Sequence, residues 1–166
     1  MTDHNLIHTG ILLLAAVPFG YAAISDIRRY TIPNVCTLAL CALYPFHFWL
    51  APEAVPLMAS LLVMSVAFAV SFAFHALKRL GGGDVKLITV AALWAGPALV
   101  GDFVIVMALA GGLLSLIYIS HFYIAPVLGF DHAGPSGIQD NPLTTKLPYG
   151  VAIAVGGLVT LMQLAH

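Results

Sequence analysis

Two aspartates carry the chemistry that this sequence could perform. Asp26 follows the first apolar segment, and Asp84 directly follows three glycines at residues 81–83. Two carboxylates held close together can hydrolyse a peptide bond, because the ionised one draws a proton from water while the protonated one polarises the carbonyl group. A carboxylate at a membrane boundary is costly and usually has a function. Asp26 and Asp84 are therefore the candidate catalytic pair.

A purely structural role for the same two side chains is the alternative. Asp26 is close in sequence to Arg28 and Arg29, and either arginine could form an ion pair with it. Asp84 is close to Lys86, and an aspartate at the start of a helix often caps the free backbone N–H groups there. Charge placement alone leaves both interpretations open.

The composition predicts an integral membrane protein with a single domain over residues 1–166. Of these residues 61% are hydrophobic and 8% are charged, whereas a soluble domain carries about 25% charged residues. The formal net charge of −1 indicates no basic face, so nucleic acid is not a predicted partner. The apolar composition makes the lipid bilayer a predicted partner. The N-terminus lacks the basic region of a secretory signal, so we expect the first apolar stretch to remain as an anchor.

Apolar segments separated by short polar or proline-containing stretches predict an all-α fold, a bundle of six transmembrane helices. Each segment is judged against the roughly 20 residues that a helix needs to cross the hydrocarbon core. The predicted spans are residues 6–24, 34–50, 54–77, 85–100, 102–124 and 149–164.

The lysines and arginines predict how this bundle is oriented. With six spans, the loops at residues 25–34, 78–84 and 125–148 share one face. They carry five of the basic residues, and Lys86 begins the fourth span on the same side. Basic residues favour the cytoplasmic side of a membrane. Both termini are therefore predicted on the non-cytoplasmic side, and Asp26 and Asp84 at the cytoplasmic boundary.

Three separated motifs resemble those of the prepilin peptidase family, membrane aspartic proteases with a GxGD motif. Asp26 followed by Ile32-Pro33-Asn34 resembles one signature, and Gly81-Gly82-Gly83-Asp84 followed by Val85-Lys86-Leu87 resembles the other. The segment from Leu147 to Ala154 is similar to the final-helix motif of the short branch that serves Flp-type (tight-adherence) pili. The three motifs occur in the expected order on a chain of matching length and predicted span count.

This resemblance implies that Asp26 and Asp84 are catalytic and need no cofactor. It implies cleavage of the short basic leader of a type IV-like prepilin, a substrate whose leader is followed by an apolar helix. The site would face the cytoplasm in a bacterial inner membrane. Larger family members add a domain with paired CxxC motifs and methylate the new N-terminus. Cys36 and Cys41 form no CxxC motif, so we expect peptidase activity without methyltransferase activity.

The predicted substrate-binding residues surround the two aspartates. The glycines at 81–83 could let an extended substrate segment lie beside Asp84, since glycine permits unusual backbone angles and close approach. Asp131 and Asp140 on the long loop could attract the basic leader, although a simple mobile connector is the alternative. The remaining residues of the predicted set are Lys86, Pro33, Asn34 and Pro148.

Two rival functions belong to other classes. A small transporter could use Asp26 and Asp84 to relay protons or cations, but an ionisable group near the bilayer midplane would then be expected. A non-catalytic assembly subunit would keep its function after loss of Asp84. No metal site is predicted, because only His4 and His8 among the dispersed histidines have ligand-like spacing. A homo-oligomer is left open.

Overall fold

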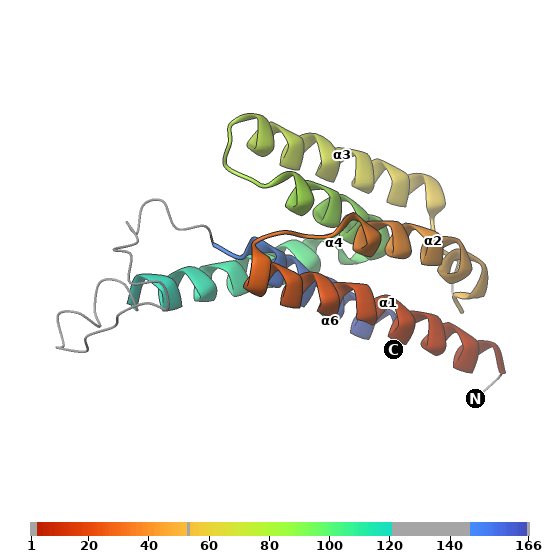
Figure 1. Cartoon of the computed structure of the whole chain (residues 1–166). Helices are drawn as coiled ribbons and strands as arrows, with labels where there is room; N and C mark the ends of the chain where they lie inside the picture. The colour runs from red at the N-terminus through yellow and green to blue at the C-terminus, as the bar shows by residue number, and fades with distance from the viewer. Residues whose placement is uncertain (1–2, 53, 121–146, 166) are drawn as a thin grey trace.

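Helices account for nearly all of the part of the chain that can be described. The structure is a computed structural model that describes residues 3–52, 54–120 and 147–165. These residues contain five helices and no strand (Figure 1). The helices are α1 (Asp3–Arg29), α2 (Asn34–Leu50), α3 (Leu57–Ala76), α4 (Gly82–Ile119) and α6 (Tyr149–Leu164). The predicted all-α class is confirmed.

Prolines mark the start of three helices. Pro33, Pro56 and Pro148 each stand immediately before the first residue of α2, α3 and α6, with φ between −64° and −76°. Proline fits there because its fixed φ is compatible with a helix start and no hydrogen bond needs its missing N–H. Helices α2 and α6 begin and end at the same residues as the predicted segments 34–50 and 149–164. The predicted start of the third helix at residue 54 is wrong, because Pro56 delays it to residue 57.

Three of the described helices are long and apolar enough to cross a membrane. They are Leu6–Arg29 within α1, the whole of α3 and the whole of α4, while α2 and α6 are shorter apolar helices of 17 and 16 residues. The chain therefore has the helices of an integral membrane protein. Its exposed surface carries many large apolar side chains, which is the surface expected of a protein surrounded by lipid.

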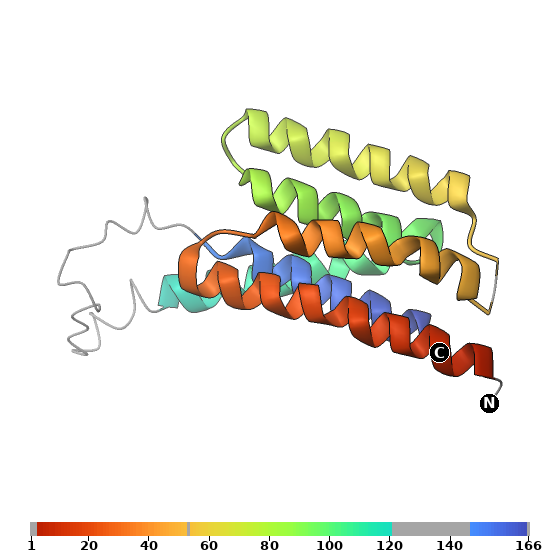
Figure 2. The ribbon, with the colours of Figure 1, turned by 45° about the vertical axis from the view of Figure 1, so that its right-hand side comes forward.

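A reversal at Gly96 divides α4 into two antiparallel halves. Gly96 has φ 57° and ψ −170°, a left-handed conformation that glycine adopts at little cost, and Pro97 follows it. Figures 1 and 2 show the half before Gly96 and the half after it running in opposite directions. The predicted boundary between spans 85–100 and 102–124 is therefore misplaced by a few residues, and residues 121–124 lie outside the described part.

Contacts with other helices fix the directions of the two halves. A Cβ atom at Gly96 would lie 3.0 Å from Ser60 Oγ, near the start of α3, and Gly82 lies beside His75, near the end of α3. In the second half, Gln163 near the end of α6 donates a hydrogen bond of 2.9 Å to Asp102. The first half is thus antiparallel to α3, and the second begins beside the end of α6.

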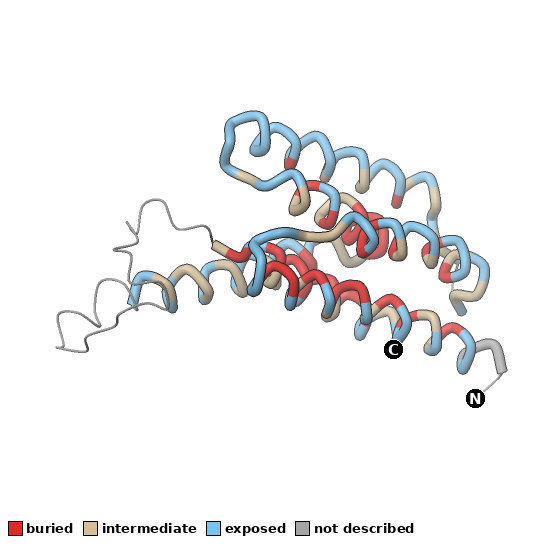
Figure 3. The backbone as a smooth tube through the Cα atoms, in the orientation of Figure 1, coloured by how far each residue is buried: buried red, intermediate tan, exposed pale blue. Residues whose placement is uncertain are grey.

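The core lies where α1, α4 and α6 meet. Two neighbouring glycines of α6 face different partners, since a Cβ atom at Gly156 would lie 3.0 Å from the ring of Phe103 and one at Gly157 would overlap the ring of Phe19. Such small residues let helices pack closely within a membrane. Buried positions concentrate on these helices, whereas α3 is exposed along most of its length (Figure 3). Both termini lie at one end of the bundle (Figure 1).

Candidate active site

Asp26 lies in the last turn of α1 rather than in a loop after it. The helix continues to Arg29, and the next residue, Tyr30, has φ 50° and donates its N–H to the Asp26 carbonyl oxygen at 2.9 Å. A left-handed residue after the last turn is a common way to end a helix. The prediction that the first helix ends at residue 24 is therefore wrong, and the extra turn carries Asp26 into the bundle, where it is 5% exposed.

The carboxylate of Asp26 is held by the first turn of α6. The N–H of Gly150 donates a buried hydrogen bond of 2.7 Å to Asp26 Oδ2. The partially positive end of the α6 dipole therefore faces this carboxylate. A Cβ atom at Gly150 would lie only 2.8 Å from the same oxygen, so residue 150 must be small for the bond to form. Neither Arg28 nor Arg29 forms an ion pair with Asp26 in the described structure.

Asp84 lies in the first turn of α4 and is half-buried. The N–H of Gly81 donates a hydrogen bond of 3.1 Å to Asp84 Oδ2, so the side chain caps the start of its own helix. The capping role considered from the sequence is therefore present. The alternative pairing with Lys86 is not, because Lys86 Nζ donates a 3.0 Å hydrogen bond to Asn34 Oδ1 at the start of α2.

The turn between α1 and α2 joins the surroundings of the two aspartates. Ser25 Oγ donates a hydrogen bond of 2.8 Å to the Thr31 carbonyl oxygen and so holds this turn against α1. The next residue, Ile32, contacts glycines on two other helices. A Cβ atom would lie 3.1 Å from Ile32 Cβ if added at Gly83 and 2.8 Å from Ile32 Cδ1 if added at Gly150. Both helix starts are therefore packed against one side chain.

These contacts bring the two carboxylates to the same end of the bundle. Asp26 is in the last turn of α1 and Asp84 in the first turn of α4, on either side of the turn that carries Ile32. Each carboxylate accepts one backbone N–H on Oδ2, and within the described residues Oδ1 of each accepts no hydrogen bond. One oxygen of each pair member is therefore available to water or to a peptide carbonyl, which is what acid–base hydrolysis requires.

Some of the other predicted site residues lie at the starts of helices, and two lie outside the described residues. Gly81 precedes α4, and Gly82 and Gly83 form its first turn with ordinary negative φ angles. The expected unusual backbone angles at these glycines are therefore absent, and the space beside Gly83 is used by Ile32. Pro33 and Pro148 precede α2 and α6, as described above. Asp131 and Asp140 lie outside the described residues.

Sequence reasoning missed two residues that position the aspartates. Gly150 supplies the donor to Asp26, and Ile32 connects the starts of α4 and α6. Both belong to motifs quoted above, but neither carries a side chain that suggests chemistry. The available signal was a glycine at the start of the last helix, directly after Pro148 and Tyr149. A further hydrogen bond of 3.0 Å joins the hydroxyl groups of Tyr30 and Tyr118 at this end.

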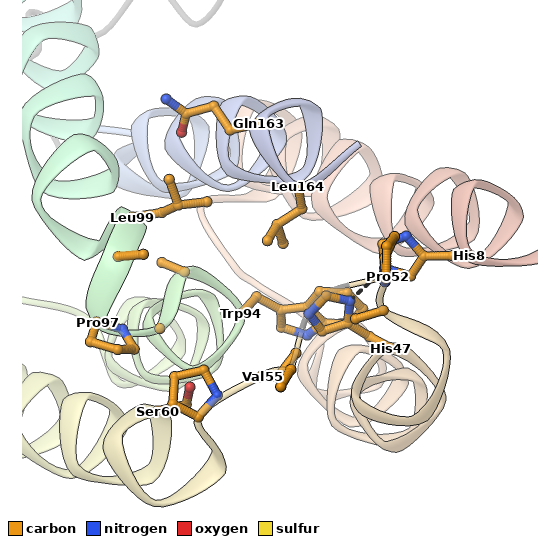
Figure 4. A pocket seen from close by; sticks show the side chains of 16 residues that line it. His8, His47, Pro52, Val55, Ser60, Trp94, Pro97, Leu99, Gln163 and Leu164 are labelled. Carbon is orange, nitrogen blue, oxygen red and sulfur yellow. Dashed lines mark hydrogen bonds between the residues drawn. The ribbon is translucent and has the colours of Figure 1, made fainter. Parts of the chain in front are cut away.

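A second polar cluster lies at the opposite end of the bundle, near both termini. His8 Nε2 and His47 Nδ1 are 2.9 Å apart in a buried hydrogen bond, and the ring of Trp94 stacks on His47. These side chains line a pocket of about 360 Å³ (Figure 4). His8 is thus hydrogen-bonded to a histidine of α2. The described residues contain no group of three or more histidine, cysteine or acidic side chains arranged to hold a metal ion.

Comparison with protein-family models gives a match over about two thirds of the chain. The sequence model described as the type IV leader peptidase family matches residues 12–120, which include Asp26, Asp84 and Gly96. No curated protein and no solved structure matches the chain.

Proposed function

Since the chain belongs to the type IV leader peptidase family, we propose that it is a membrane aspartic endopeptidase. Its substrate is a type IV-like prepilin, from which it removes the short basic leader. The observation that carries this proposal is the location of Asp26 and Asp84 at the same end of the bundle, each with one oxygen free of hydrogen bonds among the described residues. No comparable pair of carboxylates is found elsewhere in the described structure.

The proposed reaction is the addition of water across one peptide bond. The ionised carboxylate takes a proton from water while the protonated carboxylate donates a hydrogen bond to the scissile carbonyl oxygen. The hydroxide equivalent attacks the carbonyl carbon and forms a tetrahedral intermediate. The carbon–nitrogen bond then breaks, and the leaving nitrogen takes a proton from the carboxylate that had accepted one from water. The two carboxylates hold a single proton between them, and each returns to its starting protonation state at the end of the turnover.

The proposed topology has six crossings, with the two halves of α4 counted separately. Asp26 and Asp84 then face the cytoplasm, and both termini lie on the other side of a bacterial inner membrane. The described basic residues support this orientation, because they gather at the ends of α1 and α3 and the start of α4, which form the aspartate end. The predicted substrate is a Flp-type prepilin, cleaved without subsequent methylation.

The position of the aspartates also bears on the transporter alternative. A carrier that relays protons or cations is expected to hold an ionisable group near the bilayer midplane. Asp26 lies in the last turn of α1 and Asp84 in the first turn of α4. This location at one end of the bundle supports a peptidase more than a carrier.

Co-expression with a Flp-type prepilin tests the proposal. We expect the wild-type protein to shorten the prepilin on a gel, and Asp26→Asn and Asp84→Asn proteins to leave it intact. Asp102→Asn is the matched control, because Asp102 is an exposed carboxylate hydrogen-bonded to Gln163 at the far end of the bundle. Cleavage that persists in both site variants would overturn the aspartic mechanism.

A further inference from the structure

An apolar groove runs between α3 and both halves of α4. Its volume is about 890 Å³. Side chains of α3 form one wall and side chains from both sides of the Gly96 reversal form the other, so the groove exists only because α4 turns back on itself. Representative lining residues are Val66, Val70 and Phe74 of α3, and Ala92, Val104 and Met107 of α4.

One end of the groove reaches the aspartate end of the bundle. Leu80 and Tyr149 both line it. Leu80 directly precedes Gly81, whose N–H is bound by Asp84, and Tyr149 directly precedes Gly150, whose N–H is bound by Asp26. The groove therefore ends beside the backbone donors of both carboxylates. A substrate helix lying in the groove would have one of its ends next to the atoms proposed to carry out hydrolysis.

We infer that this groove receives the apolar helix of the prepilin, an inference that rests on the proposed function. In such a substrate the leader precedes the helix, so the bond to be cut lies near the N-terminal end of the helix. A helix lying in the groove with this end toward Leu80 and Tyr149 delivers that bond to Asp26 and Asp84. The apolar groove and the polar site thus match the two parts of the substrate in order.

The length and floor of the groove suit a helix. Its α3 wall extends from Leu62 to Leu77, about 22 Å at 1.5 Å per residue, or most of the roughly 30 Å hydrocarbon core. Ala67, Ser71 and Ala92 provide small side chains along it, and such residues allow helices to approach closely in membranes. The Ser71 hydroxyl is already bonded to the Ala67 carbonyl oxygen at 2.6 Å, so it demands no partner from the occupant.

Photocrosslinking tests which molecule fills the groove. Photoreactive benzoylphenylalanine replaces Val70 in one full-length protein and Phe72 in another, both also carrying Asp84→Asn so that the prepilin stays intact. Val70 lines the groove and Phe72 does not, although both lie on α3 at similar depth and are 53% and 50% exposed. We expect a prepilin adduct at position 70 that is about tenfold more abundant than at position 72. Lipid adducts alone at position 70, no prepilin adduct there, or equal prepilin adducts at both positions would overturn the inference.

Kinetics provide a second test that does not depend on crosslinking. Val70→Trp fills the groove and should raise the KM for the prepilin about tenfold, with kcat within twofold of the wild type, since the reacting groups are untouched. Phe72→Trp should leave both constants unchanged. Equal KM values for the two variants count against the groove. If the wild-type protein itself does not cleave the prepilin, the peptidase proposal fails; if it cleaves and Val70→Trp behaves like it, only the groove proposal fails.

Discussion

The two ends of the bundle use their polar side chains in opposite ways. At the histidine end, His8 and His47 bind each other, and Trp94 stacks on His47 while donating its N–H to the Leu40 carbonyl oxygen at 3.2 Å. At the aspartate end, Asp26 and Asp84 bind backbone N–H groups and keep one oxygen each free of described partners. His8, His47 and Trp94 therefore each have a hydrogen-bond partner within the protein, while the buried hydroxyls of Tyr44 and Ser60 beside them have none among the described residues. The two carboxylates at the second end are left partly available.

The groups that we expect to stabilise the fold and the groups that we expect to react with substrate therefore lie at different ends of the molecule. A buried polar group contributes to stability when its hydrogen bonds are made within the protein. A catalytic group must instead keep an oxygen for the substrate, and the surrounding fold must supply its position. We therefore expect substitutions at the aspartate end to change cleavage with little effect on folding, and substitutions at the histidine end to do the reverse.

The double variant Asp26→Asn/Asp84→Asn should show the largest effect. General acid–base groups contribute about 10²–10⁴-fold to rate, so each single variant should lose about a thousandfold in cleavage rate. Because the two carboxylates act as one unit, the double variant should lose little more than either single variant. Quantitative single-turnover cleavage of the prepilin measures this. Losses that multiply would show that the two aspartates act independently.

Gly150→Ala should have the next largest effect. The added Cβ would lie 2.8 Å from both Asp26 Oδ2 and Ile32 Cδ1, so the carboxylate must move or lose its hydrogen bond. A displacement of about 1 Å can cost about a hundredfold in rate, and we expect a loss of about tenfold to a hundredfold. Gly112→Ala is the control, since its Cβ would meet no atom within 4 Å. Equal cleavage by the two variants would remove Gly150 from the positioning role.

Lys86→Met should have a smaller effect on cleavage. The hydrogen bond from Lys86 to Asn34 joins the starts of α4 and α2 at an exposed position, and such bonds contribute modestly. We expect about a twofold to fivefold loss of cleavage rate. Asn34→Leu should cause a similar loss, and the double variant should lose no more than either single variant. If the two losses multiply, Lys86 acts on the substrate rather than through Asn34.

His47→Leu should have the smallest effect on cleavage and a clear effect on stability. Removing this 2% exposed ring leaves His8 buried without its partner, which typically costs about 1–3 kcal/mol in the free energy of unfolding. Cleavage by the folded protein should stay within twofold of the wild type. Trp49→Leu on the same helix is the control, because Trp49 is 82% exposed. Unfolding in detergent and cleavage assays together measure both quantities. A large loss of cleavage would show that the histidine end influences the reaction at the aspartate end, contrary to this expectation.

Much of the fold follows from local features of the sequence. Apolar composition predicted a helical membrane protein, and Pro33 and Pro148 marked the starts of α2 and α6, since a proline affects the backbone at its own position. The resemblance to prepilin peptidases is confirmed by the family match. The end of α1 was predicted too early, because the charged residues after Ile24 suggested a loop although nothing in them prevents a helix.

The site was predictable only in part. Asp26 and Asp84 were chosen because charged side chains are rare and the two lie in recognisable motifs, and their catalytic role remains a prediction. The backbone donor at Gly150 is 124 residues from Asp26 in sequence. No property of a glycine reveals which carboxylate its N–H will meet, because that depends on how α1 and α6 pack.

The sequence by itself determined the helices, the apolar surface and the identity of the two candidate carboxylates. These follow from hydropathy, proline positions and residue type, which act over a few neighbouring residues. The tertiary structure alone decided that Gly150 holds Asp26, that Ile32 packs against two helix starts, and that α4 turns back to form a groove with α3. Each of these contacts joins residues far apart in the chain, and only the packing of whole helices brings them together.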